Sequence, residues 1–167
     1  MGLLTREKSM ISQHAILDPG VVLGENVQIW HFTHVRERVE IGRDTNIGSH
    51  CYIDVAVRIG SKCKIQSGCF IYWPAVIGDG VFIGPGVKII NDKHPWAVDS
   101  DGKKTTRADI SFEGVTIEDG ASIGAGVILM PGIRIGRNAM VGAGCLITKD
   151  VQPESLVYGI ATRIPTP

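Results

Sequence analysis

The chain has 167 residues, of which 44% are hydrophobic and 20% charged, and its formal net charge at pH 7 is zero. This balance predicts one globular domain with a sizeable core and excludes the strongly basic surface of a nucleic-acid-binding protein. No apolar stretch is long enough to cross a bilayer, and residues 1–10 lack the apolar core of a signal peptide. We therefore expect a soluble, cytoplasmic protein that binds neither nucleic acid nor a membrane.

From residue 11 onward the dominant pattern is a branched aliphatic at every sixth position, with a small or β-branched residue two positions earlier. A period of six fits neither an α-helix nor an ordinary alternating strand, but it is typical of hexapeptide β-helix repeats. Residues i and i+2 of a strand share a face, so each hexad predicts one short strand with two inward side chains. The aliphatic positions are Ile11, Leu17, Leu23, Ile29, Val35, Ile41, Ile47, Ile53, Ile59, Ile65, Ile71, Ile77, Ile83, Ile89, Ile117, Ile123, Leu129, Ile135, Val141 and Ile147.

The number of hexads in one coil follows from the residue after each aliphatic. This residue is glycine at positions 24, 42, 60 and 78, in steps of eighteen. Three hexads per coil therefore predict a three-sided parallel β-helix, in which one corner needs glycine for its backbone conformation or for close approach. We expect an all-β solenoid over residues 1–152 and a C-terminal tail over residues 153–167 that leaves the repeat.

The four cysteines fit this solenoid as core residues. Cys51, Cys63, Cys69 and Cys145 all occupy the small inward position, and none follows CxxC spacing. Cys51 and Cys69 are one coil apart in the same column, but a cytosolic setting disfavours a disulfide between them. We predict buried free thiols and no metal site.

The repeat is interrupted once, by a polar loop over residues 91–113. A long insertion in a regular scaffold is more often functional than decorative. His94 in this loop carries the side chain best suited to proton transfer near neutral pH, while Asn91 and Asp92 lie at the loop's root, where a substrate amine could be held. The other histidines are weaker candidates; His31, between Trp30 and Phe32, is the most plausible of them for a subunit interface or a ligand contact.

Several segments carry a closer resemblance. They are IWHFTHV at 29–35, KIQ at 64–66, Tyr72, GDGVFIGP at 78–85, NDKHP at 91–95, IGAGVILMPGIRIG and VGAGCLITKDV. With the hexad pattern, they resemble the hexapeptide-repeat acyltransferases over nearly the whole chain, a family of left-handed parallel β-helices. Within it they are most similar to enzymes that N-acetylate the 3-amino group of UDP- or dTDP-linked sugars during surface polysaccharide (O-antigen) synthesis.

The resemblance implies a homotrimer that binds acetyl-CoA and a nucleotide-linked amino sugar in clefts between neighbouring prisms. It implies that Asn91 orients the amine, and that Asp92, His94 or the departing CoA thiolate takes the proton. The other implied contacts are His31, Gln66, Tyr72 and Arg107 for the sugar nucleotide, and Gly124, Ala125, Gly142, Ala143, Lys149 and Arg163 for the coenzyme.

Two departures from the family pattern concern these sites. The tail reads Gly159-Ile160-Ala161-Thr162-Arg163, without the usual proline. The usual IQNN stretch reads Ile65-Gln66-Ser67-Gly68, and Trp73-Pro74 follows Tyr72 in place of a small turn. These changes affect the expected adenine end of the coenzyme site and the acceptor site, respectively.

Three alternatives remain open at this point. A small-molecule or sugar O-acetyltransferase could use His94 as its base. A γ-type carbonic anhydrase would need three histidines from two chains around zinc, and the spacing of His31 and His34 is wrong for it. A non-catalytic scaffold would have no use for a polar loop that carries His, Asn, Asp and Arg.

Overall fold

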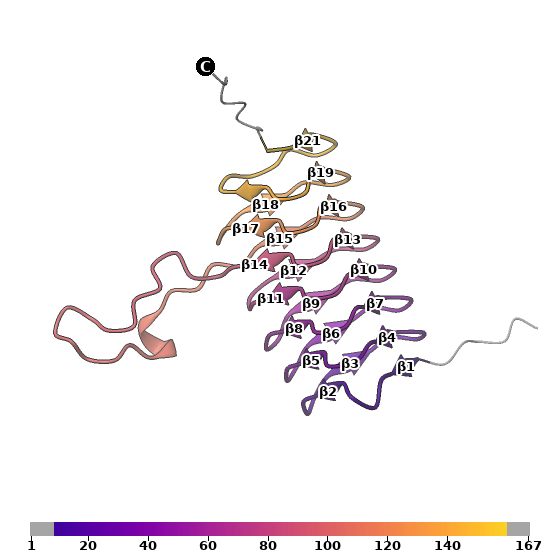
Figure 1. The fold of residues 1–167 in the computed structure, drawn as a ribbon, viewed down its shortest axis with the longest axis horizontal. Coiled ribbons are helices and arrows are strands. Elements are labelled where there is room, and N and C mark those ends of the chain that lie inside the picture. The colour runs from indigo at the N-terminus through magenta and orange to yellow at the C-terminus, as the bar shows by residue number, and fades with distance from the viewer. Residues whose placement is uncertain (1–8, 160–167) are drawn as a thin grey trace, which may run out of the picture.

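The computed structural model describes residues 9–159, and these form a parallel β-helix with one extruded loop (Figure 1). The twenty-one strands are all two residues long and are arranged in three parallel sheets, as the hexad pattern predicts. Partner residues along most of each sheet lie eighteen positions apart; Ile65, for example, pairs with Ile47 and Ile83. The all-β, left-handed β-helix expected from the sequence is confirmed. Within the described residues no helix is long and apolar enough to cross a membrane.

Each face of the prism is one sheet. The first sheet contains β1 (Met10–Ile11), β4 (Gln28–Ile29), β7 (Asn46–Ile47), β10 (Lys64–Ile65), β13 (Phe82–Ile83), β16 (Ser122–Ile123), β19 (Met140–Val141) and β21 (Leu156–Val157). The second contains β2 (Ile16–Leu17), β5 (His34–Val35), β8 (Tyr52–Ile53), β11 (Phe70–Ile71), β14 (Lys88–Ile89), β17 (Ile128–Leu129) and β20 (Leu146–Ile147). The third contains β3 (Val22–Leu23), β6 (Glu40–Ile41), β9 (Arg58–Ile59), β12 (Val76–Ile77), β15 (Thr116–Ile117) and β18 (Arg134–Ile135).

The core is the narrow interior of the prism. The aliphatic of each hexad and the small residue two positions before it are both buried, as for Ile29 and Val27, which have no exposed surface. The four cysteines are free and buried, as predicted. Burial raises the pKa of the Cys63 thiol, so this side chain stays protonated and packs as a small apolar group.

Glycine at one corner permits the close stacking of coils. A Cβ atom on Gly42 would lie 2.5 Å from the backbone nitrogen of Ser61 in the next coil. Gly24, Gly60 and Gly78 meet the neighbouring coil in the same way. Close approach, rather than a special backbone conformation, therefore explains the eighteen-residue glycine repeat.

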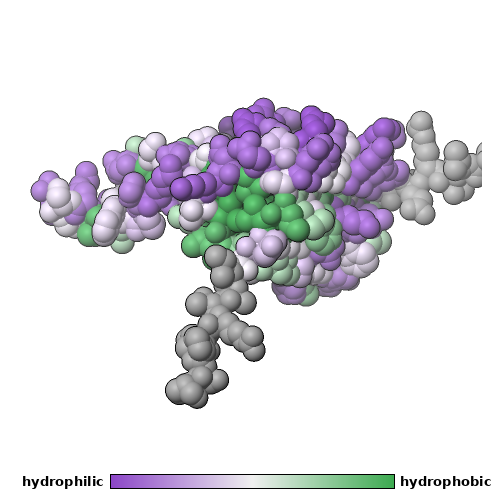
Figure 2. Space-filling view, turned by 90° about the horizontal axis from the view of Figure 1, so that it is seen from above, coloured by the Kyte–Doolittle hydropathy of each residue, from purple (hydrophilic) through white to green (hydrophobic). Residues whose placement is uncertain are grey.

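The insertion and the end of the chain complete the fold. Residues 91–113 leave the solenoid after β14 and return before β15, and they contain a 3-10 turn, η1 (Arg107–Asp109), and an isolated antiparallel bridge between Val98 and Lys104. The loop is mostly polar, whereas apolar side chains gather at the end of the solenoid seen in Figure 2. Because β21 pairs with β19, the stacking continues past residue 152, into the segment that the sequence analysis assigned to a tail leaving the repeat. Arg163, one of the predicted coenzyme-binding residues, lies outside the described residues.

We expect Gly42→Ala to destabilise the fold by about 1–3 kcal/mol, because the added methyl group forces two coils apart. The measurement is urea unfolding followed by circular dichroism. The neighbouring variant Arg43→Ala removes a side chain that is 63% exposed, so it should stay within about 0.5 kcal/mol of the parent. Equal stabilities for the two variants would contradict this explanation of the glycine repeat.

Candidate active site

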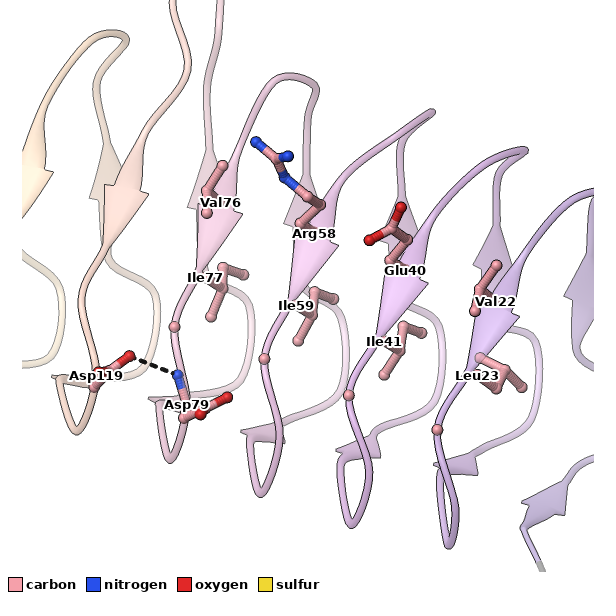
Figure 3. Close-up of a pocket in the computed structure, with 14 residues that line it drawn as sticks. Val22, Leu23, Glu40, Ile41, Arg58, Ile59, Val76, Ile77, Asp79 and Asp119 are labelled. Carbon is pink, nitrogen blue, oxygen red and sulfur yellow. Dashed lines mark hydrogen bonds between the residues drawn. The ribbon is translucent and has the colours of Figure 1, made fainter.

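The three corners of the prism differ in what they present to solvent. The first corner joins the first sheet to the second, the second corner joins the second sheet to the third, and the third corner closes the coil. The loop leaves from the second corner. The third corner carries the stacking glycines, and a cavity of about 530 Å³ lies along the third sheet next to them (Figure 3).

Asn91 lies at the base of the loop and ties it to the solenoid. Its backbone oxygen accepts a hydrogen bond from the N–H of Glu113, 2.9 Å away, at the loop's other end. Lys93 and Glu113 form an ion pair of 2.6 Å beside it. The Nδ2 group of Asn91 donates to the carbonyl oxygen of Trp73, one coil below. This contact fixes the orientation of the amide, and within residues 9–159 its Oδ1 makes no hydrogen bond.

Asp54 holds the other side of the same peptide segment. It is 7% exposed, and its Oδ2 accepts a hydrogen bond from the backbone N–H of Trp73 at 3.2 Å. Its Oδ1 accepts from the hydroxyl of Tyr52 at 3.3 Å. The backbone N–H of Trp73 therefore donates to Asp54, and its carbonyl oxygen accepts a hydrogen bond from the Asn91 amide. The buried carboxylate thus positions the Asn91 amide indirectly, through Trp73.

The network continues down the second corner to the first coils. Arg36 donates to the Tyr52 hydroxyl at 2.9 Å and to Asp18 at 2.8 Å. His34 Nε2 lies 3.0 Å from the same carboxylate. The hydrogen bond with His34, together with that from Arg36, keeps the pKa of Asp18 below its usual value. Charged groups from successive coils thus satisfy one another along this edge.

Tyr72 and Arg107, two of the predicted substrate-binding residues, also belong to the second corner. The Tyr72 ring lies 5.7 Å from that of Tyr52, and partial burial, with Tyr52 and Asp54 nearby, raises the pKa of its phenol. The Arg107 guanidinium lies 5.3 Å from the Trp73 ring centre and 5.4 Å from that of Phe112. Arg107 thereby packs the returning limb of the loop against the corner, an arrangement typical of cation–π contacts.

His94 and Asp92 are adjacent, but the imidazole is not held by the carboxylate. Asp92 Oδ1 accepts a hydrogen bond of 2.8 Å from the backbone N–H of His94, so the contact shapes the turn. The His94 ring is exposed on the loop. It stands close to Asn91 in sequence and is open to a ligand approaching the loop.

The predicted coenzyme-binding residues Gly124, Ala125, Gly142 and Ala143 lie together on the first corner. A Cβ atom on Gly124 would fall on the backbone of Ala143, so this glycine is required by coil stacking. The open surface instead comes from Ala125 and Ala143 and from two glycines that the sequence analysis did not single out, Gly126 and Gly144. Both have positive φ, and a Cβ on either would meet nothing within 4 Å.

The lower coils of the first corner carry rings in place of glycine. Phe32 has a φ of 60° and stacks between His14, at 5.4 Å, and His50, at 5.1 Å. His31 lies in this group and Gln66 just above it, so both are one sheet's width from Asn91 within a single chain. His14 and His50 share one column, as their spacing predicts.

Two further predictions concern charged residues and metals. Lys149 follows β20 and is exposed on the second corner, away from Gly142 and Ala143 on the first. Across the described part of the chain, no three His, Cys, Asp or Glu side chains are grouped so that they could hold a metal ion.

Comparison with known proteins identifies the class to which this fold and loop belong. The model of the bacterial transferase hexapeptide family (six repeats) matches residues 9–54, 56–91 and 114–149, leaving out the loop, and that of the hexapeptide repeat of succinyl-transferase matches residues 38–72. The chain therefore belongs to the hexapeptide-repeat transferase family.

Individual relatives agree with this assignment. The chain is 41% identical over 83 residues to a galactoside O-acetyltransferase of Lactococcus lactis, covering 50% of this chain and 38% of the relative. It is 32% identical over 152 residues to the bifunctional protein GlmU of Exiguobacterium sp., covering 89% of this chain and 30% of that protein. The chain thus spans less than half the length of these curated relatives.

A solved structure shares the fold. AntD, an N-acyltransferase from Bacillus cereus solved with dTDP and coenzyme A, superposes with a TM-score of 0.54 at 19% identity, over 93% of this chain and 78% of AntD.

We expect Asp54→Ala to lower the free energy of unfolding by about 1–3 kcal/mol, because the Trp73 N–H and the Tyr52 hydroxyl lose a buried acceptor. Limited proteolysis should also cut within residues 91–113 faster, since the segment that anchors the loop is released. Asp101→Ala, in the exposed part of the loop, is the matched control. If both variants unfold and are cleaved like the parent, Asp54 does not position the loop.

Proposed function

We propose that this protein transfers an acetyl group from acetyl-CoA to the 3-amino group of a UDP- or dTDP-linked sugar, as a cytoplasmic step of surface polysaccharide (O-antigen) synthesis. The observation that carries the proposal is the amide of Asn91. Its Nδ2 group donates a hydrogen bond to the Trp73 carbonyl oxygen, so the free Oδ1 is a hydrogen-bond acceptor of fixed orientation at the base of the loop. An amine with N–H groups matches that acceptor.

In the proposed reaction, Asn91, Asp92 and His94 orient the amine and accept its proton. Asn91 Oδ1 accepts a hydrogen bond from the substrate amine. This contact orients the lone pair of the amine nitrogen toward the thioester carbonyl carbon. A C–N bond forms, the C–S bond breaks, and the coenzyme leaves as thiolate. The exposed imidazole of His94 takes the proton that the amine loses, while Asp92 holds the turn that carries His94.

Coenzyme binding is assigned to the first corner, and this assignment requires a second chain. Ala125, Gly126, Ala143 and Gly144 leave a strip of backbone without long side chains, where an extended pantetheine arm could lie. Asn91 is on the second corner of the same prism. Both groups can serve one reaction if neighbouring copies in a homotrimer place the first corner of one prism beside the loop of the next.

Exposed aromatic and aliphatic side chains on the prism are consistent with such an assembly. Trp30 and Phe32 are 37% and 59% exposed. Leu146 and Leu156, near the end of the solenoid, are 59% and 60% exposed. Apolar surface of this kind favours a protein partner.

A sugar O-acetyltransferase is the second candidate. The similarity to the galactoside O-acetyltransferase of Lactococcus lactis favours it, and a hydroxyl acceptor would depend on His94 as a base more strongly than an amine does. The two candidates differ in the acceptor atom, so the panel of acceptors below separates them.

The test is release of CoA thiol from acetyl-CoA in the presence of UDP- and dTDP-linked 3-amino sugars, with 4-amino sugars, galactosides and free sugars as controls. We expect release with a 3-amino sugar nucleotide. Release with galactosides alone would replace the proposal with the second candidate, and silence with every acceptor would overturn both.

Asn91→Ala should nearly abolish turnover while leaving the oligomeric state unchanged. Asn91→Asp is the sharper variant, because it keeps the shape but turns a second oxygen toward the Trp73 carbonyl oxygen. We expect kcat to fall at least about a hundredfold in both variants. Normal turnover by Asn91→Asp would remove the oriented amide from the mechanism.

His94→Ala should lower kcat by about a hundredfold or more and abolish the acidic limb of the pH profile of kcat/KM. Lys103→Ala, in the same loop, is the control and should retain the parent rate. A His94→Ala enzyme that keeps its rate across pH would show that the proton goes to the CoA thiolate.

A further inference from the structure

The arginines of the described chain divide into two groups. Arg36, Arg43, Arg134 and Arg137 each form an ion pair with a carboxylate within 4 Å. Arg38, Arg58 and Arg107 form no such pair anywhere in residues 9–159. All three are exposed.

These three unpaired arginines surround one tryptophan. Two adjoining cavities, of about 340 and 450 Å³, share Arg38, Ala56 and Trp73 in their walls. Arg58 lines the first and Arg107 the second. We call the two together the Trp73 groove; it runs from the third sheet across the second corner to the base of the loop. Figure 3 shows Arg58 on β9 with its guanidinium directed away from the third corner.

The charge of the groove is positive after its acids are taken into account. Glu37 also lines it, but this carboxylate is paired with Arg36 at 3.0 Å. Glu40 stands beside Arg58 on the neighbouring strand, outside ion-pair distance. Three guanidinium groups without matching carboxylates favour a polyanion, and phosphate groups fit the two-pronged geometry of arginine.

The groove is also preorganised and correctly placed. Arg107 lies over the edge-to-face pair of Trp73 and Phe112, and these two ring contacts restrict its side chain before any ligand binds. Trp73, in the wall of the groove, accepts the hydrogen bond from Asn91. Trp73 therefore links the groove to Asn91, so a ligand bound there lies near the residue that we propose orients the amine.

We propose that the Trp73 groove binds the diphosphate of the nucleotide-linked sugar, with Arg38 and Arg107 contacting phosphate oxygens and Arg58 completing the cationic wall. This inference rests on the proposed function, since it assigns the diphosphate of the same acceptor to a definite edge of the prism. The diphosphate of coenzyme A has the same chemistry, so the experiment must separate the two sources.

The experiment is isothermal titration calorimetry with UDP, dTDP, uridine, thymidine and CoA, each added alone, against the parent protein and its arginine variants. We expect a nucleoside diphosphate to bind more tightly than its nucleoside. Its affinity should fall as the salt concentration rises. Arg38→Gln and Arg107→Gln should each weaken nucleoside diphosphate binding about tenfold or more and leave CoA binding unchanged.

Arg43→Gln is the matched control: it makes the same change of charge on the third corner and should bind every probe like the parent. Arg107→Lys keeps the charge but loses the planar fork, so it should restore only part of the affinity. Unchanged unfolding midpoints will show that the variants fold.

Three results would overturn the inference: unchanged nucleoside diphosphate binding in Arg38→Gln and Arg107→Gln, a loss confined to CoA binding, or no binding of either nucleoside diphosphate by the parent. Because these titrations contain no acetyl donor, they are independent of turnover. Arginine-dependent binding of UDP or dTDP without acetyl transfer in the acceptor panel would reject the proposed reaction and keep the diphosphate site.

Discussion

The whole structure depends on the return of the backbone to the same lateral position after each coil. Only then does every two-residue strand pair with the strand above and below it and bury its aliphatic in the shared core. The constraint is strict along the faces, where a shift of one residue would turn the aliphatics outward. It is met even across the loop, since Ile77 pairs with Ile117 exactly as it pairs with Ile59 below.

One consequence is that, within the described residues, no functional side chain projects into the narrow interior of the prism, which is filled by packing. Polar networks form among the outward side chains of the faces and corners, where neighbouring coils place them one above another. The second corner has such a network, from Asp18 through Arg36 and Tyr52 to Asp54. It ends at Trp73, whose carbonyl oxygen accepts the hydrogen bond from Asn91 at the base of the loop. The rigid solenoid thus supplies a loop base whose geometry does not depend on the loop's exposed tip.

The sequence predicts the regular part of this structure well because periodicity is a property of every coil. The hexad positions, the three-hexad coil, the buried cysteines and the extruded loop all follow from residue spacing. The partners of Asn91 do not, because Trp73 and Asp54 are joined to it by hydrogen bonds between coils. The available signal was the column Asp18, Arg36, Asp54 and Tyr72, in which charged and phenolic residues recur every eighteen positions. Parallel pairing at β21 was missed because the spacing shortens from six to four residues between Ile147 and Val151, so that Val157 pairs with Val141 sixteen rather than eighteen positions away.

The central claim is that the reaction uses the first corner of one chain and the second corner of its neighbour. The most direct measurement is the activity of mixed assemblies, purified through two different tags, in which one chain carries Asn91→Ala and the other Ala143→Trp. Each variant alone should be inactive. In a mixed trimer about one site in three combines an intact loop with an intact first corner, so about a third of the parent activity should return. If the mixed assemblies stay inactive, the two corners do not meet in a site shared between chains, and the account is wrong.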